Sequence, residues 1–147
     1  MNKKKKTILI TGASSGIGKA TALSLAKEGH KVFAGVRKKV DKTELDNLNF
    51  NIKGVYIDIT NNLSIEKAFY FILKNTDKLD VLINNAGIAV ASPVEFINLK
   101  RLKEQFEVNT FGVISVVQRF MPILHNGKII NISSMAASGI FPYISPY

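Results

Sequence analysis

Three glycines lie close together near the start of the chain, in residues 11–18 (TGASSGIG). Glycine allows a tight turn and a close approach of the backbone to a ligand. If such a turn opens a helix, its unpaired N–H groups and the helix dipole favour a bound diphosphate. A glycine-rich turn alone is a weak signal, because many loops use glycine only for positive φ. Its meaning therefore depends on the elements on either side.

The elements around this turn are predicted from the apolar pattern. Short apolar runs without polar alternation are typical of parallel strands that are buried on both faces. They occupy residues 7–11, 32–36, 55–59, 81–83 and 129–132. Apolar residues at three- and four-residue steps predict helices over 16–28, 64–74 and 102–124. This alternation predicts the α/β class, with a doubly wound parallel sheet of five strands in a Rossmann-like three-layer sandwich that binds ligands at the carboxyl ends of its strands.

The glycine spacing, Gly-x-x-x-Gly-x-Gly, resembles that of the short-chain dehydrogenase/reductase family. The resemblance continues, in the family's order, through further motifs along the chain. They are Asp58 after the third predicted strand, residues 84–87 (NNAG) after the fourth, Asn109 in the long helix and residues 131–134 (NISS) after the fifth. Because these motifs cover the whole chain, the resemblance implies a single Rossmann domain, residues 1–147, that binds a nicotinamide dinucleotide.

The resemblance also implies which residues bind the cofactor. They are Gly12, Ser14, Ser15, Gly16, Ile17, Gly18, Arg37, Asp58, Ile59, Asn85, Ala86 and Gly87. Within this set, Asp58 would accept a hydrogen bond from the adenine amino group. Residues 85–87 would run along the cofactor's ribose.

The charge after the second predicted strand bears on the choice of cofactor. Enzymes that use NAD usually place an acidic residue there, which binds the ribose 2′-hydroxyl. Here Val36 takes that position and is followed by Arg37, Lys38 and Lys39. A guanidinium can pair bidentately with a 2′-phosphate, so the sequence predicts NADP rather than NAD. The alternative for Lys38 and Lys39 is that they are solvated loop charges.

Catalysis in the family needs a tyrosine that transfers the proton, a serine that polarises the carbonyl oxygen and an asparagine that anchors a proton-relay water. The matching residues are Tyr147, Ser134 and Asn109, and Ser134 precedes Tyr147 by thirteen residues, the family's usual separation. Tyr143 competes for the role of the acid, but the residue thirteen positions before it is Ile130. The family's lysine lies four residues after the tyrosine, beyond the last residue of this sequence. We therefore expect an incomplete domain that lacks the lysine, the last two strands and the segment that covers the substrate.

The substrate is expected to be a small alcohol or carbonyl compound. Residues 32–37 and 93–96 resemble the branch of 17β-hydroxysteroid and retinol dehydrogenases, which implies an apolar substrate. The alternative is a non-catalytic nucleotide-binding fragment or pseudoenzyme. The full-length protein is expected to be a homo-oligomer, and the isolated chain to be marginally stable or oligomeric, with Phe106, Phe111 and Phe120 exposed.

The formal net charge of +9 raises the possibility of a nucleic-acid partner. Its distribution argues against one, because residues 1–6 form a basic tail without interleaved aromatic residues and many of the other cations alternate with acids. The chain has no cysteine and its two histidines are far apart, so no metal site is expected. Neither a signal peptide nor a membrane span is recognisable, which predicts a soluble cytoplasmic protein.

Overall fold

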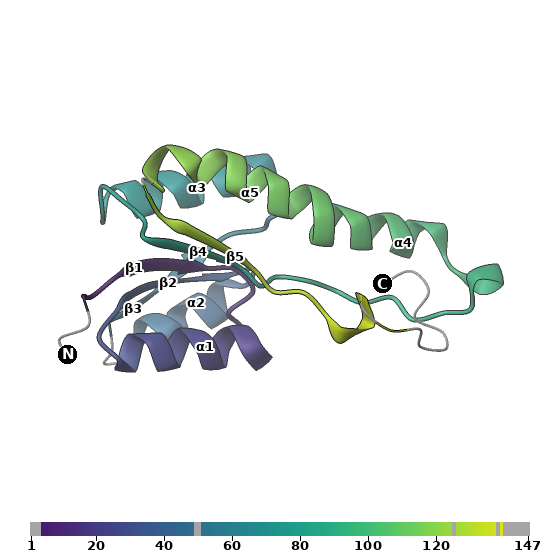
Figure 1. Cartoon of the computed structure of the whole chain (residues 1–147), viewed down its shortest axis with the longest axis horizontal. Helices are drawn as coiled ribbons and strands as arrows, with labels where there is room; N and C mark the ends of the chain where they lie inside the picture. Colours follow the sequence, from purple (N-terminus) through teal and green to yellow (C-terminus); the bar gives the residue numbers. More distant parts are fainter. Residues whose placement is uncertain (1–3, 49–50, 125, 138, 140–147) are drawn as a thin grey trace.

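The computed structural model describes residues 4–48, 51–124, 126–137 and 139, which form one parallel sheet covered by helices (Figure 1). The strands are β1 (Thr7–Ile10), β2 (Lys31–Val36), β3 (Ile52–Tyr56), β4 (Val81–Asn84) and β5 (Lys128–Asn131). Their order is β3-β2-β1-β4-β5, and all neighbouring pairs are parallel. The chain reverses direction across the sheet between β1 and β4, at the topological switch point where such sheets bind ligands. The predicted doubly wound α/β fold is confirmed.

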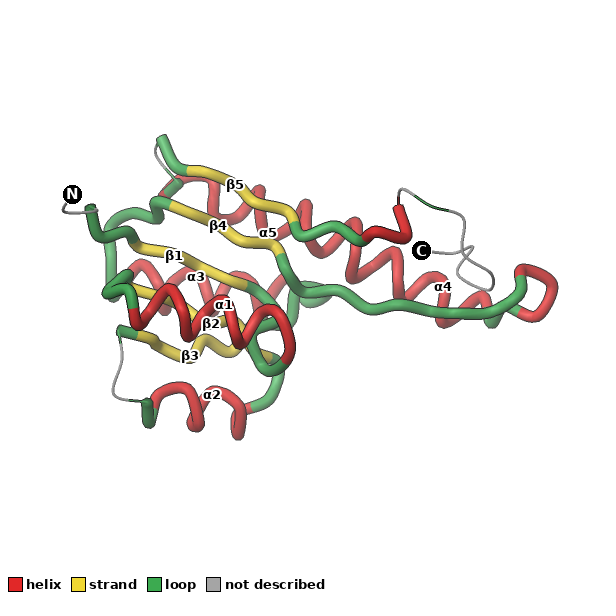
Figure 2. Tube along the Cα trace, turned by 60° about the horizontal axis from the view of Figure 1, so that its bottom comes forward, coloured by secondary structure: helices red, strands yellow, loops and turns green. Residues whose placement is uncertain are grey.

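Helices cover both faces of the sheet and make three layers. The helices α1 (Gly16–Lys27) and α2 (Lys39–Asp46) lie on one face, and α3 (Asn62–Leu73) and α5 (Val113–Phe120) lie on the other (Figures 1 and 2). The helix α4 (Leu99–Phe106) continues through a π-helical segment, η2 (Glu107–Gly112), into α5. These three elements form one long rod, and its α4 end projects beyond the sheet (Figure 1). No helix among the described residues is long and apolar enough to cross a membrane.

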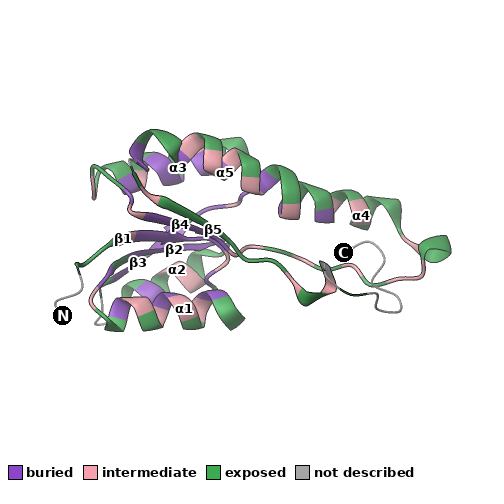
Figure 3. Ribbon diagram, in the orientation of Figure 1, coloured by how far each residue is buried: buried purple, intermediate pink, exposed green. Residues whose placement is uncertain are grey.

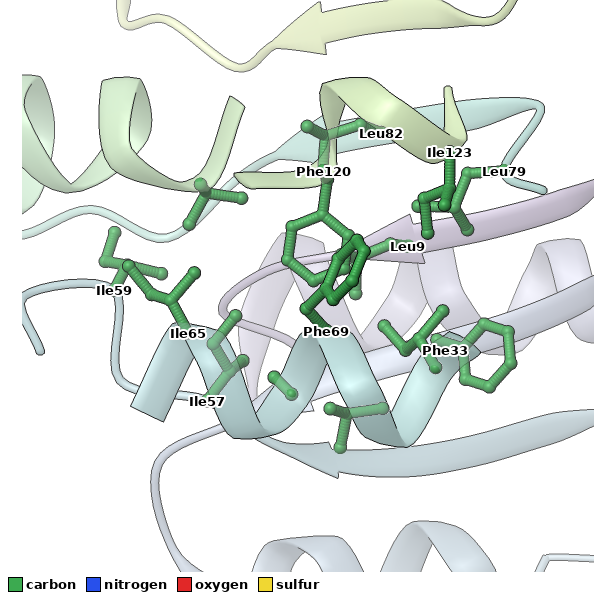
Figure 4. Close-up of a cluster of buried hydrophobic side chains, with 14 of the residues drawn as sticks. Leu9, Phe33, Ile57, Ile59, Ile65, Phe69, Leu79, Leu82, Phe120 and Ile123 are labelled. Atoms are coloured by element: carbon green, nitrogen blue, oxygen red, sulfur yellow. The ribbon is translucent and has the colours of Figure 1, made fainter. Parts of the chain in front are cut away.

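Successive side chains of the strands enter opposite layers of the core. On β1, Ile8 and Ile10 join the cluster beneath α1, whereas Leu9 joins the cluster beneath α3 and α5. In that second cluster the rings of Phe69 and Phe120 meet edge to face, with centroids 5.6 Å apart (Figure 4). The two helices are therefore held against the same part of the sheet.

The exposure expected for three phenylalanines is right for two of them. Phe106 and Phe111 are 49% and 54% exposed, because they lie on the part of the rod that leaves the sheet. Phe120 is fully buried, because α5 lies over the sheet there and α3 covers its side. Figure 3 shows the same division, with buried residues at the centre of the sheet and an exposed edge strand β5.

Three elements differ from the prediction, one of which is the single helix expected over 102–124, which is divided into α4, η2 and α5. β3 covers Ile52–Tyr56 rather than residues 55–59, and Gly54 lies within it. A Cβ at position 54 would stand 2.6 Å from the carbonyl oxygen of Lys42, so the close approach of α2 to β3 requires glycine there. The helix α2 was not predicted, because Leu45 is its only buried residue and its sequence has no apolar period. Lys39, weighed as a loop residue, is the first residue of this helix.

Candidate active site

The glycine-rich turn joins the end of β1 to the start of α1. Gly12 has a φ of 69°, and a Cβ there would stand 2.7 Å from the Cα of Ala86. Gly16 has a φ of 54°, but nothing lies within 4 Å of the place where its Cβ would be. Packing inside the protein therefore requires glycine at position 12, whereas Gly16 borders open space at the start of α1.

Thr11 ties this turn to the segment after β4. Its Oγ1 accepts hydrogen bonds from the backbone N–H groups of Asn85 and Ala86, both at 3.1 Å. In return, the Asn85 Nδ2 donates to the carbonyl oxygens of Thr11 and Gly12 at 3.0 and 3.1 Å. Thr11 was not predicted as a site residue, although a hydroxyl residue between a buried strand and the first glycine was an available signal. The turn and the β4 segment are thus fixed to each other.

A cavity of about 470 Å³ lies where β1, β2, β3 and β4 end. Its walls include all the residues predicted to bind the cofactor: Gly12, Ser14, Ser15, Gly16, Ile17, Gly18, Arg37, Asp58, Ile59, Asn85, Ala86 and Gly87. Gly35, Val36, Ile57, Ile88 and Val108 complete the lining and were not predicted. The structure brings the predicted set together, and the role of each residue in binding stays a prediction.

Among the part of this lining that the structure describes, two residues are ionisable, Arg37 and Asp58. Arg37 is exposed and directly follows β2, and Lys38 occupies the N-terminal cap position of α2. The Asp58 Oδ1 accepts hydrogen bonds from the backbone N–H and the Oγ1 of Thr60 at 3.0 and 2.7 Å, which orients the carboxylate after β3. Among the residues that the structure describes, no group of three or more His, Cys, Asp or Glu side chains gathers to hold a metal ion.

A second cavity, of about 780 Å³, shares a wall with the first. The shared residues are Ile17 and the segment 85–88. The second cavity is lined by Asn109 and Ser134, two of the three predicted catalytic residues. All of its described lining residues are uncharged. Tyr147 and its competitor Tyr143 lie outside the described residues.

The side chain of Asn109 is hydrogen-bonded to both polar groups of the Ile88 backbone. Its Oδ1 accepts from the Ile88 N–H at 2.9 Å, and its Nδ2 donates to the Ile88 carbonyl oxygen at 2.8 Å. Asn109 lies in η2, and π-helical insertions are frequent at functional sites. The role of Asn109 in anchoring a proton-relay water stays a prediction.

A pair of asparagines links the ends of β4 and β5. Asn84 and Asn131 are register partners, and the Asn84 Nδ2 donates to the Asn131 Oδ1 at 2.8 Å. The Ile132 N–H also donates to the Asn84 carbonyl oxygen at 2.8 Å. Neither asparagine was predicted as a site residue, although both belong to the motifs quoted above. The pair fixes the start of the segment that carries Ser134, whose Oγ accepts from the Ala136 N–H at 3.2 Å.

Comparison with known protein sequences agrees with this geometry. The family model described as short chain dehydrogenase matches residues 6–147. The chain is 37% identical to a 3-ketodihydrosphingosine reductase from Bacteroides thetaiotaomicron over 139 residues, which are 92% of this chain and 49% of that protein. It is 38% identical to the mitochondrial D-beta-hydroxybutyrate dehydrogenase of Mus musculus, with 97% of this chain and 45% of that protein covered. The chain thus spans about half the length of the curated relatives it matches.

Solved structures give the same result. A short-chain dehydrogenase from Streptomyces avermitilis superposes with a TM-score of 0.89 at 27% identity, covering 100% of this chain and 56% of that one. A gluconate 5-dehydrogenase from Burkholderia cenocepacia, solved in complex with NADP and tartrate, has a TM-score of 0.86 at 27% identity. That match covers 97% of this chain and 58% of that one.

Proposed function

Because the chain belongs to the short-chain dehydrogenase family, we propose that the protein which carries it is an oxidoreductase that interconverts an alcohol and a ketone or aldehyde, with NADP as its cofactor. One observation carries this proposal. The cavity behind the glycine-rich turn and the cavity that contains Asn109 and Ser134 share a wall at the topological switch point of the sheet. A cofactor in the first cavity would therefore lie beside a substrate in the second.

The residues of the first cavity fit a dinucleotide. The open space beside Gly16 lies at the start of α1, where backbone N–H groups and the helix dipole favour a diphosphate. The turn residues 12–18 would hold that diphosphate, Asp58 the adenine, and residues 85–87 the ribose. When bound, the cofactor supplies or accepts the hydride.

The chain's own residues would orient the substrate and move the proton. The Ser134 Oγ accepts from the Ala136 N–H, so its own hydrogen is available to polarise a substrate oxygen in the second cavity. Tyr147 would transfer the proton to or from that oxygen. Asn109, which lines the same cavity, would anchor the proton-relay water.

The preference for NADP rests on charge. Val36, at the end of β2, offers no carboxylate to a ribose 2′-hydroxyl, and among the described residues that line the cavity Arg37 is the one cation. A hydrogen bond to a charged group contributes about 1.5–3 kcal/mol, so Arg37→Gln should weaken NADPH binding by about tenfold to a hundredfold. NADH binding should change little, because NADH lacks the 2′-phosphate.

Titration of the chain with NADPH and NADH, followed by nicotinamide fluorescence, measures this preference. Lys39→Gln is the matched control, because Lys39 is also exposed but does not line the cavity. Equal losses for the two dinucleotides in Arg37→Gln would argue against the 2′-phosphate site.

The proposed substrate is an apolar alcohol or carbonyl compound. Ile17, Phe106, Val113 and Ile132 contribute apolar surface to the second cavity, and no described lining residue offers a charge to an ionic group. The complete protein should oxidise NADPH with an uncharged ketone or aldehyde, and Ser134→Ala should lower kcat by about a hundredfold or more. Tight NADPH binding without turnover would instead indicate the non-catalytic nucleotide-binding alternative.

A further inference from the structure

Residues 85–93, between β4 and a short 3-10 turn at Val94–Phe96, belong to no strand and run extended in Figure 2. This segment leaves the sheet at the switch point and runs beside the rod formed by α4 and η2 (Figure 2). Ile88 and Ala89 of this segment line the larger cavity, and Ile88 also lines the smaller one. The position of the segment therefore decides the shape of both cavities.

Two amide side chains of the rod bind the backbone of this segment. Asn109 pairs with both the N–H and the carbonyl oxygen of Ile88, at 2.9 and 2.8 Å. The Gln105 Oε1 accepts from the N–H of Val90 at 2.6 Å. Gln105 is 3% exposed, so this hydrogen bond is shielded from water, and loss of its acceptor would leave a backbone donor unpaired.

The spacing of the two contacts matches the geometry of both partners. Residues four apart on a helix lie on one face and are separated by about 6 Å along the axis. Residues two apart in an extended segment point the same way and are separated by about 6.6 Å. Gln105 and Asn109 can therefore reach Val90 and Ile88 together, as a strand partner would. A single contact at Ile88 would leave the segment free to pivot, whereas two contacts fix its direction and register.

We propose that Gln105 is a positioning residue for the substrate cavity, because it locks the register of residues 87–90 against the rod and holds Ala89 in the cavity wall. A slip by one residue would put the larger side chain of Ile88 or Val90 at the place that Ala89 occupies in the cavity wall. The assignment of this cavity to the substrate rests on the proposed function. The fixed register of residues 87–90 does not depend on that assignment.

Hydrogen exchange of the unaltered chain tests the lock directly. The amides of Ile88 and Val90 should exchange at least about tenfold more slowly than the intervening amide of Ala89, although none of the three lies in a strand. Exchange of Val90 as fast as that of Ala89 would overturn the proposal without the need for a variant.

Three variants then isolate the acceptor. Gln105→Met keeps the length of the side chain but removes the acceptor, and should speed exchange of the Val90 amide by about tenfold while Ile88 stays protected. Gln105→Glu keeps an acceptor oxygen and should retain the slow exchange. Lys103→Met, at an exposed position of the same helix, is the control and should change neither amide.

Kinetics of the complete protein test the functional part. Gln105→Met should raise the KM for the carbonyl substrate severalfold, with the KM for NADPH and kcat nearly unchanged, and Gln105→Glu should restore most of the loss. A looser Val90 amide with an unchanged substrate KM would overturn the positioning role. Absence of turnover in the unaltered protein would count against the proposed function, whereas the exchange pattern would still decide the register lock.

Discussion

At the scale of single residues, Gly12 and Gly16 serve one turn for different reasons. Both have a positive φ, which costs about 1–2 kcal/mol for a residue with a Cβ. A Cβ at position 12 would also collide with the backbone of Ala86, whereas a Cβ at position 16 would meet no protein atom. Packing depends on the first glycine, and access of a ligand to the turn depends on the second.

Alanine at each position should therefore give different results. Gly12→Ala should lower the free energy of unfolding by about 2–5 kcal/mol, the sum of backbone strain and overpacking. Gly16→Ala should lower it by about 1–2 kcal/mol but should weaken NADPH binding more than this loss explains, because its methyl group enters the space proposed for the diphosphate. Urea unfolding and NADPH titration of both variants measure the two effects. Equal losses of stability would contradict the assignment.

Thr11 gives a second prediction at this scale. Its Oγ1 accepts from two backbone N–H groups, and the residue is 1% exposed. Thr11→Val keeps the shape but leaves both donors unpaired, at about 1–3 kcal/mol each. Thr11→Ser keeps the acceptor and should lose only the smaller contribution of a buried methyl group. Thermal unfolding compares them, and a serine variant as unstable as the valine variant would show that the methyl group matters more than the hydroxyl.

At the scale of elements, an ion pair connects α3 to α5. The Arg119 Nη2 donates to the Glu66 Oε1 at 2.9 Å, and the Arg119 Nε donates to the other carboxylate oxygen. The guanidinium also lies over the ring of Phe69, 3.4 Å from its centroid. Hydrogen bonds from Arg119 lower the pKa of the Glu66 carboxyl below its ordinary value, and the charge of Arg119 acts in the same direction.

This pKa shift predicts how stability depends on acidity. A carboxyl whose pKa is lower in the folded state stabilises the fold above its unfolded pKa, and this contribution is lost as the pH falls through the folded value. The free energies of unfolding of the wild type and Glu66→Gln should thus differ by a constant amount near neutral pH and converge below about pH 4. The effect should be modest, because the Glu66 side chain is 42% exposed.

Chemical denaturation across this pH range measures the convergence. Glu104→Gln is a suitable control, because Glu104 and Arg101 make only a single exposed contact of 3.5 Å within one helix. A difference between wild type and Glu66→Gln that persists unchanged at pH 3 would show that the neutral side chains, rather than the charge of Glu66, account for it.

The sequence predicted those elements that bury a regular apolar pattern. The strands β1, β2 and β4 and the helices α1 and α3 were predicted to within about two residues, because each combines apolar runs or steps with glycine or polar ends. α2 escaped prediction, because it buries only Leu45 and exposes Val40. The π-helical segment, which contains Asn109, could not be distinguished from an α-helix by the spacing of its apolar residues.

The candidate site was predictable only in part, for a physical reason. Residues that follow strands in the glycine and NNAG motifs must meet at one edge of a parallel sheet, so their proximity follows from the topology. Gln105 and Val90 approach each other only through the path of the segment 85–93 beside the rod. That path depends on the length of a loop and the direction of a helix, which a local pattern does not specify.

At the scale of the whole molecule, two of the surfaces that expose apolar side chains offer sites for association. On the rod, Phe111 and Ile114 are 54% and 49% exposed. On β5, Ile129 and Ile130 are 37% and 43% exposed, and within the described part of the chain β5 pairs only with β4. An unpaired strand edge with apolar side chains is a site for association with other chains. The homo-oligomer expected of the full-length protein stays a prediction.

The 147-residue chain should therefore associate with itself through these surfaces. Light scattering after gel filtration should show dimers or larger species at micromolar concentration. A double variant with Phe111→Ser and Ile114→Ser should shift the chain toward monomer without a loss of stability. Val40→Ser is the control, because Val40 is 60% exposed on α2, which lies on the opposite face of the sheet from the rod, and its replacement should leave the distribution unchanged. A wild-type chain that is monomeric at high concentration would contradict the prediction. A double variant that still associates would instead assign the contact to β5, since its edge offers backbone donors and acceptors as well as Ile129 and Ile130.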